Sequence, residues 1–190
     1  MIHPIQHHIL ENEITYTGEE LRPHWGLEQT GIYGSLMVAF IGPCKVRTQD
    51  LVDWEDKLQN EFIEAQSMLH IIGEFFDVPL NQGVLLQRFF IVWAEQHLRE
   101  SGIEKIKRQG NDIFIRNKKL SVSIATVSPV SSLMHCGFNL DATGAPVDAI
   151  GLYELGFNRD QALSFSKKLL TSYIKELEDM KKAQCKVKPL

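Results

Sequence analysis

Apolar residues in the first third of the chain form short runs between turn-forming residues. The run at 36–41 lies between a glycine and a Gly-Pro pair, which predicts a short buried strand. Residues 4–17 alternate loosely between apolar and polar, a pattern typical of an edge strand or a hairpin. Residues 18–34 are rich in glycine and proline and predict a loop with at most a short helix, whereas 50–60 fits neither helix nor strand.

Three later segments carry the three-to-four residue spacing of helices. Residues 65–76 hold four large apolar side chains at that spacing and predict a helix. Residues 81–99 are apolar around most of the circumference, which predicts a helix in the centre of the fold. Residues 158–182 carry a regular apolar stripe, and Asn158 with Gln161 forms a capping-box pattern at the start of this helix.

The middle of the chain predicts strands. Residues 112–116 alternate between apolar and polar, residues 117–118 suit a tight turn, and 119–126 form the return strand. Residues 133–140 form another strand. Helices distributed around such strands predict an α+β fold, with a mixed, mostly antiparallel sheet packed by helices, and we expect one domain over 1–190.

The faces of the two middle strands suggest a ligand site. In the first strand, Leu120, Val122 and Ile124 are expected on one face, and Lys119, Ser121, Ser123 and Ala125 on the other. In the second, Met134, Cys136, Phe138 and Leu140 oppose His135, Gly137 and Asn139. If the two small, polar faces meet, they form a shallow floor with the Lys119 ammonium at one end, ready for a carboxylate or phosphate. The alternative is an ordinary sheet face in water.

Arg88 interrupts the apolar helix predicted at 81–99. An arginine buried there requires an anionic partner. Asp53, Glu55 and a ligand phosphate are the three candidates, and the sequence does not choose among them.

Charged and metal-binding residue types narrow the classes of function. The net charge is −4, from 20 basic and 24 acidic residues, which argues against a nucleic-acid or membrane-surface protein. The seven histidines show no spacing of a zinc site, so no metal site is predicted. The acidic stretch 53–56 suits either Mg²⁺ with a nucleotide or a solvated turn.

The chain shows no export or membrane signal. Residues 1–10 lack the apolar run of a signal peptide, and no stretch approaches the length of a membrane helix. Three widely separated cysteines are expected to be reduced thiols. A cytoplasmic protein follows by elimination.

Two segments carry a resemblance to a known family. Residues 110–121 (GNDIFIRNKKLS) resemble the Asn-Asp stretch, strand, turn and Lys-Leu strand of biotin protein ligases. Residues 135–140 (HCGFNL) resemble the Gly-x-Asn strand that follows in those enzymes. Together with the expected central helix, the resemblance covers about 82–141. Through 42–44, 52–56 and 68–70 as well, the chain is similar to an uncharacterised family, the domain of unknown function numbered three-six-six, which is thought to share the fold.

The resemblance implies a fold of the biotin and lipoate ligase, or class II synthetase, type. It also implies a chemistry in which a small carboxylic acid attacks the α-phosphate of ATP, with Mg²⁺, and the acyl group then passes to a lysine of an acceptor protein. The catalytic strand lysine of the family corresponds to Lys119, and the Asn-Asp pair to Asn111 and Asp112. Ser121, Ser123, His135, Gly137, Asn139 and Arg88 complete the expected ligand site.

The chain departs from the ligase pattern in several places. No glycine- and arginine-rich loop is present, residues 42–47 being the nearest basic stretch, and Val122 replaces a glycine beside the ligand. The loop 143–147 has no cysteine, so a thioester intermediate there is not expected. From the resemblance, the first hypothesis is an acyl-adenylate-forming ligase or an acyltransferase. The alternatives are a non-catalytic module that binds a carboxylate or nucleotide and, third, a structural dimerisation domain; a homodimer stays open.

Overall fold

A five-stranded sheet forms the middle layer of the protein in a computed structural model that describes residues 4–188. Residues 1–3 lie outside the described residues. They belong to the segment 1–10, which was predicted not to be a signal peptide. The strand order is β1-β2-β3-β8-β7, with β1 parallel to β2 and the other pairs antiparallel. These strands are β1 (Gln6–Ile9), β2 (Leu36–Val46), β3 (Ile63–Phe76), β7 (Ser121–Val127) and β8 (Ser131–Asp141).

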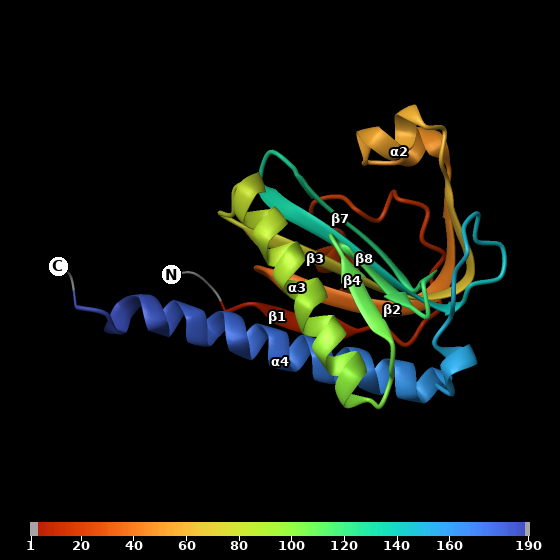
Figure 1. The fold of residues 1–190 in the computed structure, drawn as a ribbon. Helices are drawn as coiled ribbons and strands as arrows, with labels where there is room; N and C mark the ends of the chain where they lie inside the picture. Colours follow the sequence, from red (N-terminus) through yellow and green to blue (C-terminus); the bar gives the residue numbers. More distant parts are fainter. Residues whose placement is uncertain (1–3, 189–190) are drawn as a thin grey trace.

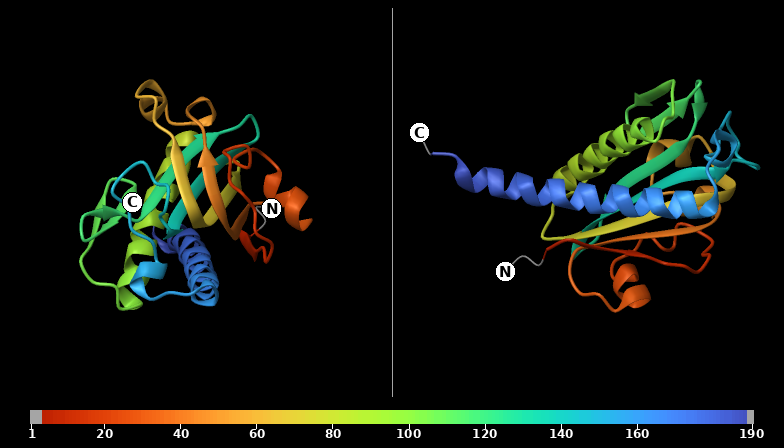
Figure 2. Two further views of the ribbon diagram at one scale, coloured as in Figure 1. Left: turned by 90° about the vertical axis from the view of Figure 1, so that its right-hand side faces the viewer. Right: turned by 90° about the horizontal axis from the view of Figure 1, so that it is seen from below.

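Two long helices cover one face of this sheet (Figures 1 and 2). They are α3 (Leu80–Glu100) and α4 (Arg159–Lys186), close to the helices predicted at 81–99 and 158–182. The short helices are α1 (Trp25–Thr30), η1 (Thr48–Asp50), α2 (Trp54–Leu58) and η2 (Tyr153–Leu155). None of the helices described here has the length and apolar character needed to cross a bilayer.

A small second sheet precedes β7. It contains β4 (Ile106–Gln109), β5 (Asp112–Ile115) and β6 (Lys118–Lys119) in that order. Arg116 and Asn117 both have positive φ between β5 and β6, so the predicted turn lies one residue earlier than expected. Gly110 and Asn111 form the turn between β4 and β5, and this turn brings Asn111 and Asp112 next to β7.

The helix predicted at 65–76 is wrong, because this segment is part of strand β3. Met68 and Ile72 belong to the core on one face of the sheet, whereas Ile71 and Phe75 belong to the core on the helical face. A strand buried on both faces shows an almost continuous apolar run, and such a run also contains the spacing of a helix.

Two apolar cores lie on the two faces of the sheet. The larger one is formed by α3, α4 and the sheet, and includes Phe90, Phe138 and Tyr173. The smaller one lies on the opposite face under α1 and the segment before it, and includes Tyr16 and Trp25. The sheet is therefore covered on the second face only in part, and this leaves room for a site there.

Helix α4 begins with the predicted capping box. The Asn158 side chain accepts a hydrogen bond from Gln161 N at 2.9 Å, and Gln161 Oε1 accepts one from Asn158 N at 2.8 Å. Replacing Asn158 with Ala leaves one amide of the first turn without a partner, so we expect the free energy of unfolding to fall by about 1 kcal/mol. Urea unfolding measures this loss, and Asn158→Ser should recover most of it. Equal stability of both variants and the parent would contradict the capping role.

Candidate functional site

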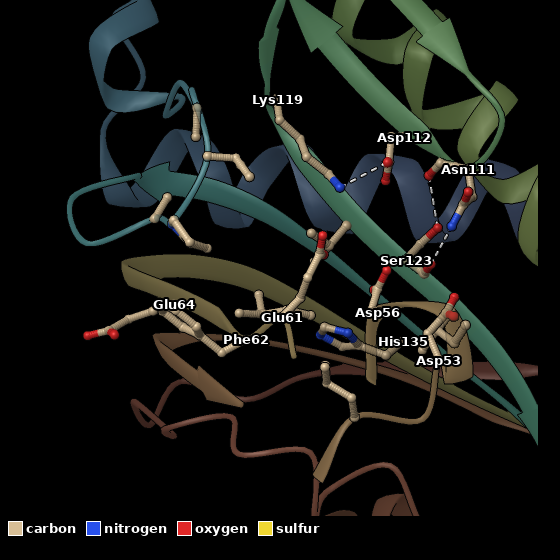
Figure 3. Close-up of a pocket in the computed structure, with 18 of the residues that line it drawn as sticks. Asp53, Asp56, Glu61, Phe62, Glu64, Asn111, Asp112, Lys119, Ser123 and His135 are labelled. Atoms are coloured by element: carbon tan, nitrogen blue, oxygen red, sulfur yellow. Dashed lines mark hydrogen bonds and ion pairs between the residues drawn. The ribbon is translucent and has the colours of Figure 1, made fainter. Parts of the chain in front are cut away.

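A cavity of about 510 Å³ lies on the sheet face opposite the long helices. Its floor comes from β7 and β8, one wall from α2 and the segment that follows it, and the other from the loop before η2 (Figure 3). The apolar lining includes Leu51, Phe62, Val122 and Ile124. This volume suits a small organic molecule.

Lys119 lies at one end of the cavity and is paired with a carboxylate. Its Nζ is 2.9 Å from Asp112 Oδ2, and the two side chains are 29% and 22% exposed. Backbone bonds hold Lys119 in place, because its N–H donates to Asp148 O and its carbonyl accepts from Ile150 N. The backbone of Lys119 is therefore held on both sides, and its ammonium lines the cavity while paired with Asp112.

A buried network orients Asn111 beside this ion pair. Gln87 Nε2 donates to Ser123 Oγ at 2.7 Å, and that hydroxyl donates to Asn111 O at 2.9 Å. Asn111 Nδ2 in turn donates to Ser123 O at 2.6 Å. Gln87 was missed by the sequence analysis, since a single polar residue on an apolar helix gives no signal of its partner.

His135 is buried in the cavity floor and belongs to a chain of two histidines. His70 Nε2 lies 3.2 Å from Gly42 O, and His70 Nδ1 lies 3.1 Å from His135 Nε2. Burial lowers the pKa of His70 to about 3, and burial with the nearby His70 ring lowers the pKa of His135. Both rings are therefore neutral at physiological pH. Tyr16 stacks on His135 with 3.9 Å between ring centroids.

Asn139 lies next along the floor of the cavity. Its side chain is 93% buried by neighbours, with Nδ2 donating to Lys119 O at 3.2 Å. Asn139 therefore connects β8 to the strand that carries the lysine. Gly137 lies between His135 and Asn139 in the strand, and a side chain added there would collide with Met68 and approach the His135 ring.

Carboxylates dominate the walls. Asp112 is joined around the cavity by Asp53, Glu55, Asp56, Glu61 and Glu64, against a single lining cation, Lys119. Burial raises the pKa of Asp56, and the charges of Asp53 and Glu61 add to the shift. The acidic stretch 53–56 thus faces a cavity as well as solvent. Glu61 and Glu64 also line the cavity, but they were not singled out from the sequence.

The predicted meeting of the two small, polar strand faces is wrong. In the β7–β8 register, Ser121 is opposite Phe138 and Ser123 is opposite Cys136, so both serines lie on the helical face of β7. Ser123 still borders the cavity beside Asn111 (Figure 3). The cavity face of β7 instead presents Val122 and Ile124. Leu120 does not share a face with them, because it lies in the core under α3 and α4. The grouping of His135, Gly137 and Asn139 on one face of β8 is confirmed.

Ser121 and Arg88, two other expected site residues, lie outside the cavity lining. Ser121 is fully buried and accepts a hydrogen bond from Ile113 N, outside the cavity lining. Arg88 is exposed on α3 beside Gly110, so the prediction of a buried arginine with an anionic partner is wrong. No cluster of three metal-ligating side chains occurs within 4–188.

Comparison with solved structures defines the class of fold. Biotin protein ligase from Aquifex aeolicus, in complex with biotin and ATP, has a TM-score of 0.57 at 17% identity, with 92% of this chain and 72% of that one covered. LipL1 of P. falciparum, in complex with lipoate, has a TM-score of 0.51 at 11% identity, over 90% of this chain and 62% of that one. The chain therefore has the α+β fold of biotin and lipoate ligases, as predicted.

The chain belongs to the family described as a domain of unknown function, DUF366, whose profile matches residues 5–188. A protein of unknown function from Pyrococcus horikoshi is similar to it at 36% identity and a TM-score of 0.90, over 98% of this chain and 99% of that chain. An uncharacterised protein of Methanocaldococcus jannaschii, MJ0805, is 30% identical over 95% of this chain and 83% of its own length. These relatives establish the family, and their names state no function.

Proposed function

We propose that this protein binds a small organic acid in the cavity above β7 and β8, with the Lys119 ammonium as counter-charge to the carboxylate. The observation that carries the proposal is the position of Lys119: a fixed, partly buried cation at the end of a cavity of small-molecule size. The Asp112 partner is part of the same site, since an incoming carboxylate would compete with it for the ammonium.

Acyl-adenylate formation, followed by transfer to an acceptor lysine, is the second candidate. The observation that favours it is the convergence of Asn111, Asp112 and Lys119 at one end of the cavity, on a fold shared with ligases. Against it stands the excess of carboxylates in the lining, which disfavours a triphosphate. Release of AMP from ATP in the presence of a bound acid would establish the second candidate, and its absence would leave binding alone.

Replacing Lys119 with Met should weaken binding of a small acid about tenfold or more, because a charge-assisted hydrogen bond is lost. Calorimetric titration of biotin, lipoate and octanoate into the parent and the variant measures the effect. Lys118→Met is the matched control, since that neighbouring lysine pairs with Asp148 at 3.4 Å and does not line the cavity. Equal affinities for the acids in all three proteins would refute the role of Lys119.

A further inference from the structure

We infer that the ligand of this cavity also carries a positively charged nitrogen, so that it is a zwitterion of the amino-acid type and not a plain carboxylic acid. This inference rests on the proposed use of the cavity as the ligand site, and it names the class of ligand. The nitrogen would lie between the carboxylates of Asp53, Asp56 and Glu61 and the floor residues His135 and Asn139.

The hydrogen bonds of His135 leave one of its ring nitrogens free as an acceptor. The carbonyl of Gly42 can only accept, so the proton of the neutral His70 is assigned to Nε2, and His70 Nδ1 is an acceptor. His135 Nε2 must then donate to it, which leaves His135 Nδ1 as a bare acceptor. This atom has no hydrogen-bond partner among residues 4–188, and it is open to the cavity that His135 lines.

Asn139 gives a second, independent acceptor in the same floor. Its amide nitrogen is used by Lys119 O, and this bond assigns the other end of the amide as Oδ1. No donor within the described part of the chain reaches that oxygen. Both acceptors are open to the cavity, where a water or a ligand N–H can reach them. Two free acceptors at neighbouring floor positions suit an N–H-rich group.

The charges of the walls specify that the group is cationic. Asp112 is neutralised by Lys119, whereas the other five lining carboxylates have no cationic partner within 4 Å in the region described. In Figure 3 the Asp56 and Glu61 carboxylates lie between Lys119 and His135. Burial raises the pKa of Asp56, and repulsion from Asp53 and Glu61 adds to the shift. An ammonium or guanidinium placed there would relieve that repulsion.

An organic cation fits this arrangement better than a metal ion. No group of three His, Cys, Asp or Glu side chains within 4–188 is placed to hold a metal ion by itself. The apolar side chains Phe62, Val122 and Ile124 also line the cavity, and they suit the carbon chain of an organic ligand. A carboxylate at Lys119 and a cationic nitrogen toward the floor then describe one molecule with two opposite ends.

The test compares three probes with the same six-carbon chain: hexanoate, hexylamine and 6-aminohexanoate. Calorimetric titration at low ionic strength should show 6-aminohexanoate binding at least about tenfold more tightly than hexanoate. The double variant Asp56→Asn, Glu61→Gln should remove this preference and leave hexanoate binding no weaker than in the parent. The control is Glu19→Gln, Glu178→Gln, which removes the same charge from exposed positions outside the cavity.

The outcomes separate the inference from the proposed function. Hexanoate binding that equals or exceeds that of 6-aminohexanoate, and that Lys119→Met abolishes, overturns the inference and leaves the proposed function intact. Hexylamine that matches 6-aminohexanoate, with no effect of Lys119→Met, overturns both the zwitterion inference and the carboxylate role of Lys119. No binding by any of the three probes at millimolar concentration overturns the inference. Thermal unfolding of each variant establishes that the amide substitutions leave the fold in place.

Discussion

Lowering the pH from 7 to 5 should destabilise this protein by about 2 kcal/mol through His70 alone. The pKa of His70 in the folded protein is lowered from the ordinary 6.5 to about 3 by burial. In the unfolded chain the same ring takes up a proton as the pH falls through 6.5, so the unfolded state gains protons that the native state does not. The stabilising contribution is complete above pH 6.5 and is lost progressively toward pH 3.

His135 adds a further loss of folding stability as the pH falls. Its pKa is also lowered, first by burial and then by the neighbouring His70 ring. A proton taken up by His70 goes to Nδ1, which accepts from His135 Nε2, so protonation of His70 breaks the chain between Gly42 O and the cavity floor. Acid should therefore disturb the ligand site along with the stability of the fold.

Urea unfolding at pH 7, 6 and 5 measures this effect in the parent and in His70→Gln. Glutamine can still donate to Gly42 O, but it does not titrate, so the variant should be less stable at pH 7 and show a shallower pH dependence. His8→Gln is the control, because His8 is exposed on β1. A dependence on pH that is equally steep in His70→Gln would mean that His70 is not the group responsible.

Helix α4 and parts of strands β2 and β8 could be predicted from the sequence, whereas strand β3 could not be distinguished from a helix. The stripe of α4 and its Asn158 cap follow from local spacing alone. Strand β3 did not, because both of its faces are buried. The edge strand expected within 4–17 is confirmed as β1, although its pairing with β2 depends on contacts far along the chain.

The candidate site was likewise predicted from the sequence only in part. Lys119, His135 and Asn139 were singled out from strand alternation, and all three line the cavity. The facing of Ser123 was wrong, because the irregular passage from β6 to β7 at Leu120 changes which side chains share a face. Acidic residues after α2 reach the cavity through the folding of a loop over β7 and β8. No local pattern encodes that approach, and it changes the electrostatic character of the site from cationic to anionic.

Gly42→Ala should destabilise the protein by about 3 kcal/mol, the second large effect expected. A Cβ at this position would lie 1.9 Å from the backbone oxygen of Ile14, so one backbone segment would have to move. Ile14 N also donates to Ile41 O at 3.1 Å, a bond that such a movement would break. Gly31→Ala is the graded control: φ is +70° there, but no atom lies within 4 Å, and the expected loss is about 1 kcal/mol.

The same substitution should weaken the ligand site, which connects the glycine to function. The segment displaced from Gly42 leads directly to Tyr16, whose ring stacks on His135, and the Gly42 carbonyl accepts from His70. Urea unfolding measures the stability of Gly42→Ala, and titration of 6-aminohexanoate into the folded variant measures the affinity of the ligand site. Because Gly31 is remote from both histidines in the hydrogen-bond chain, Gly31→Ala should lose stability without losing affinity. A Gly42→Ala protein as stable as the parent would show that the backbone at Ile14 does not pass over this residue, and the support of the cavity floor would then need another origin.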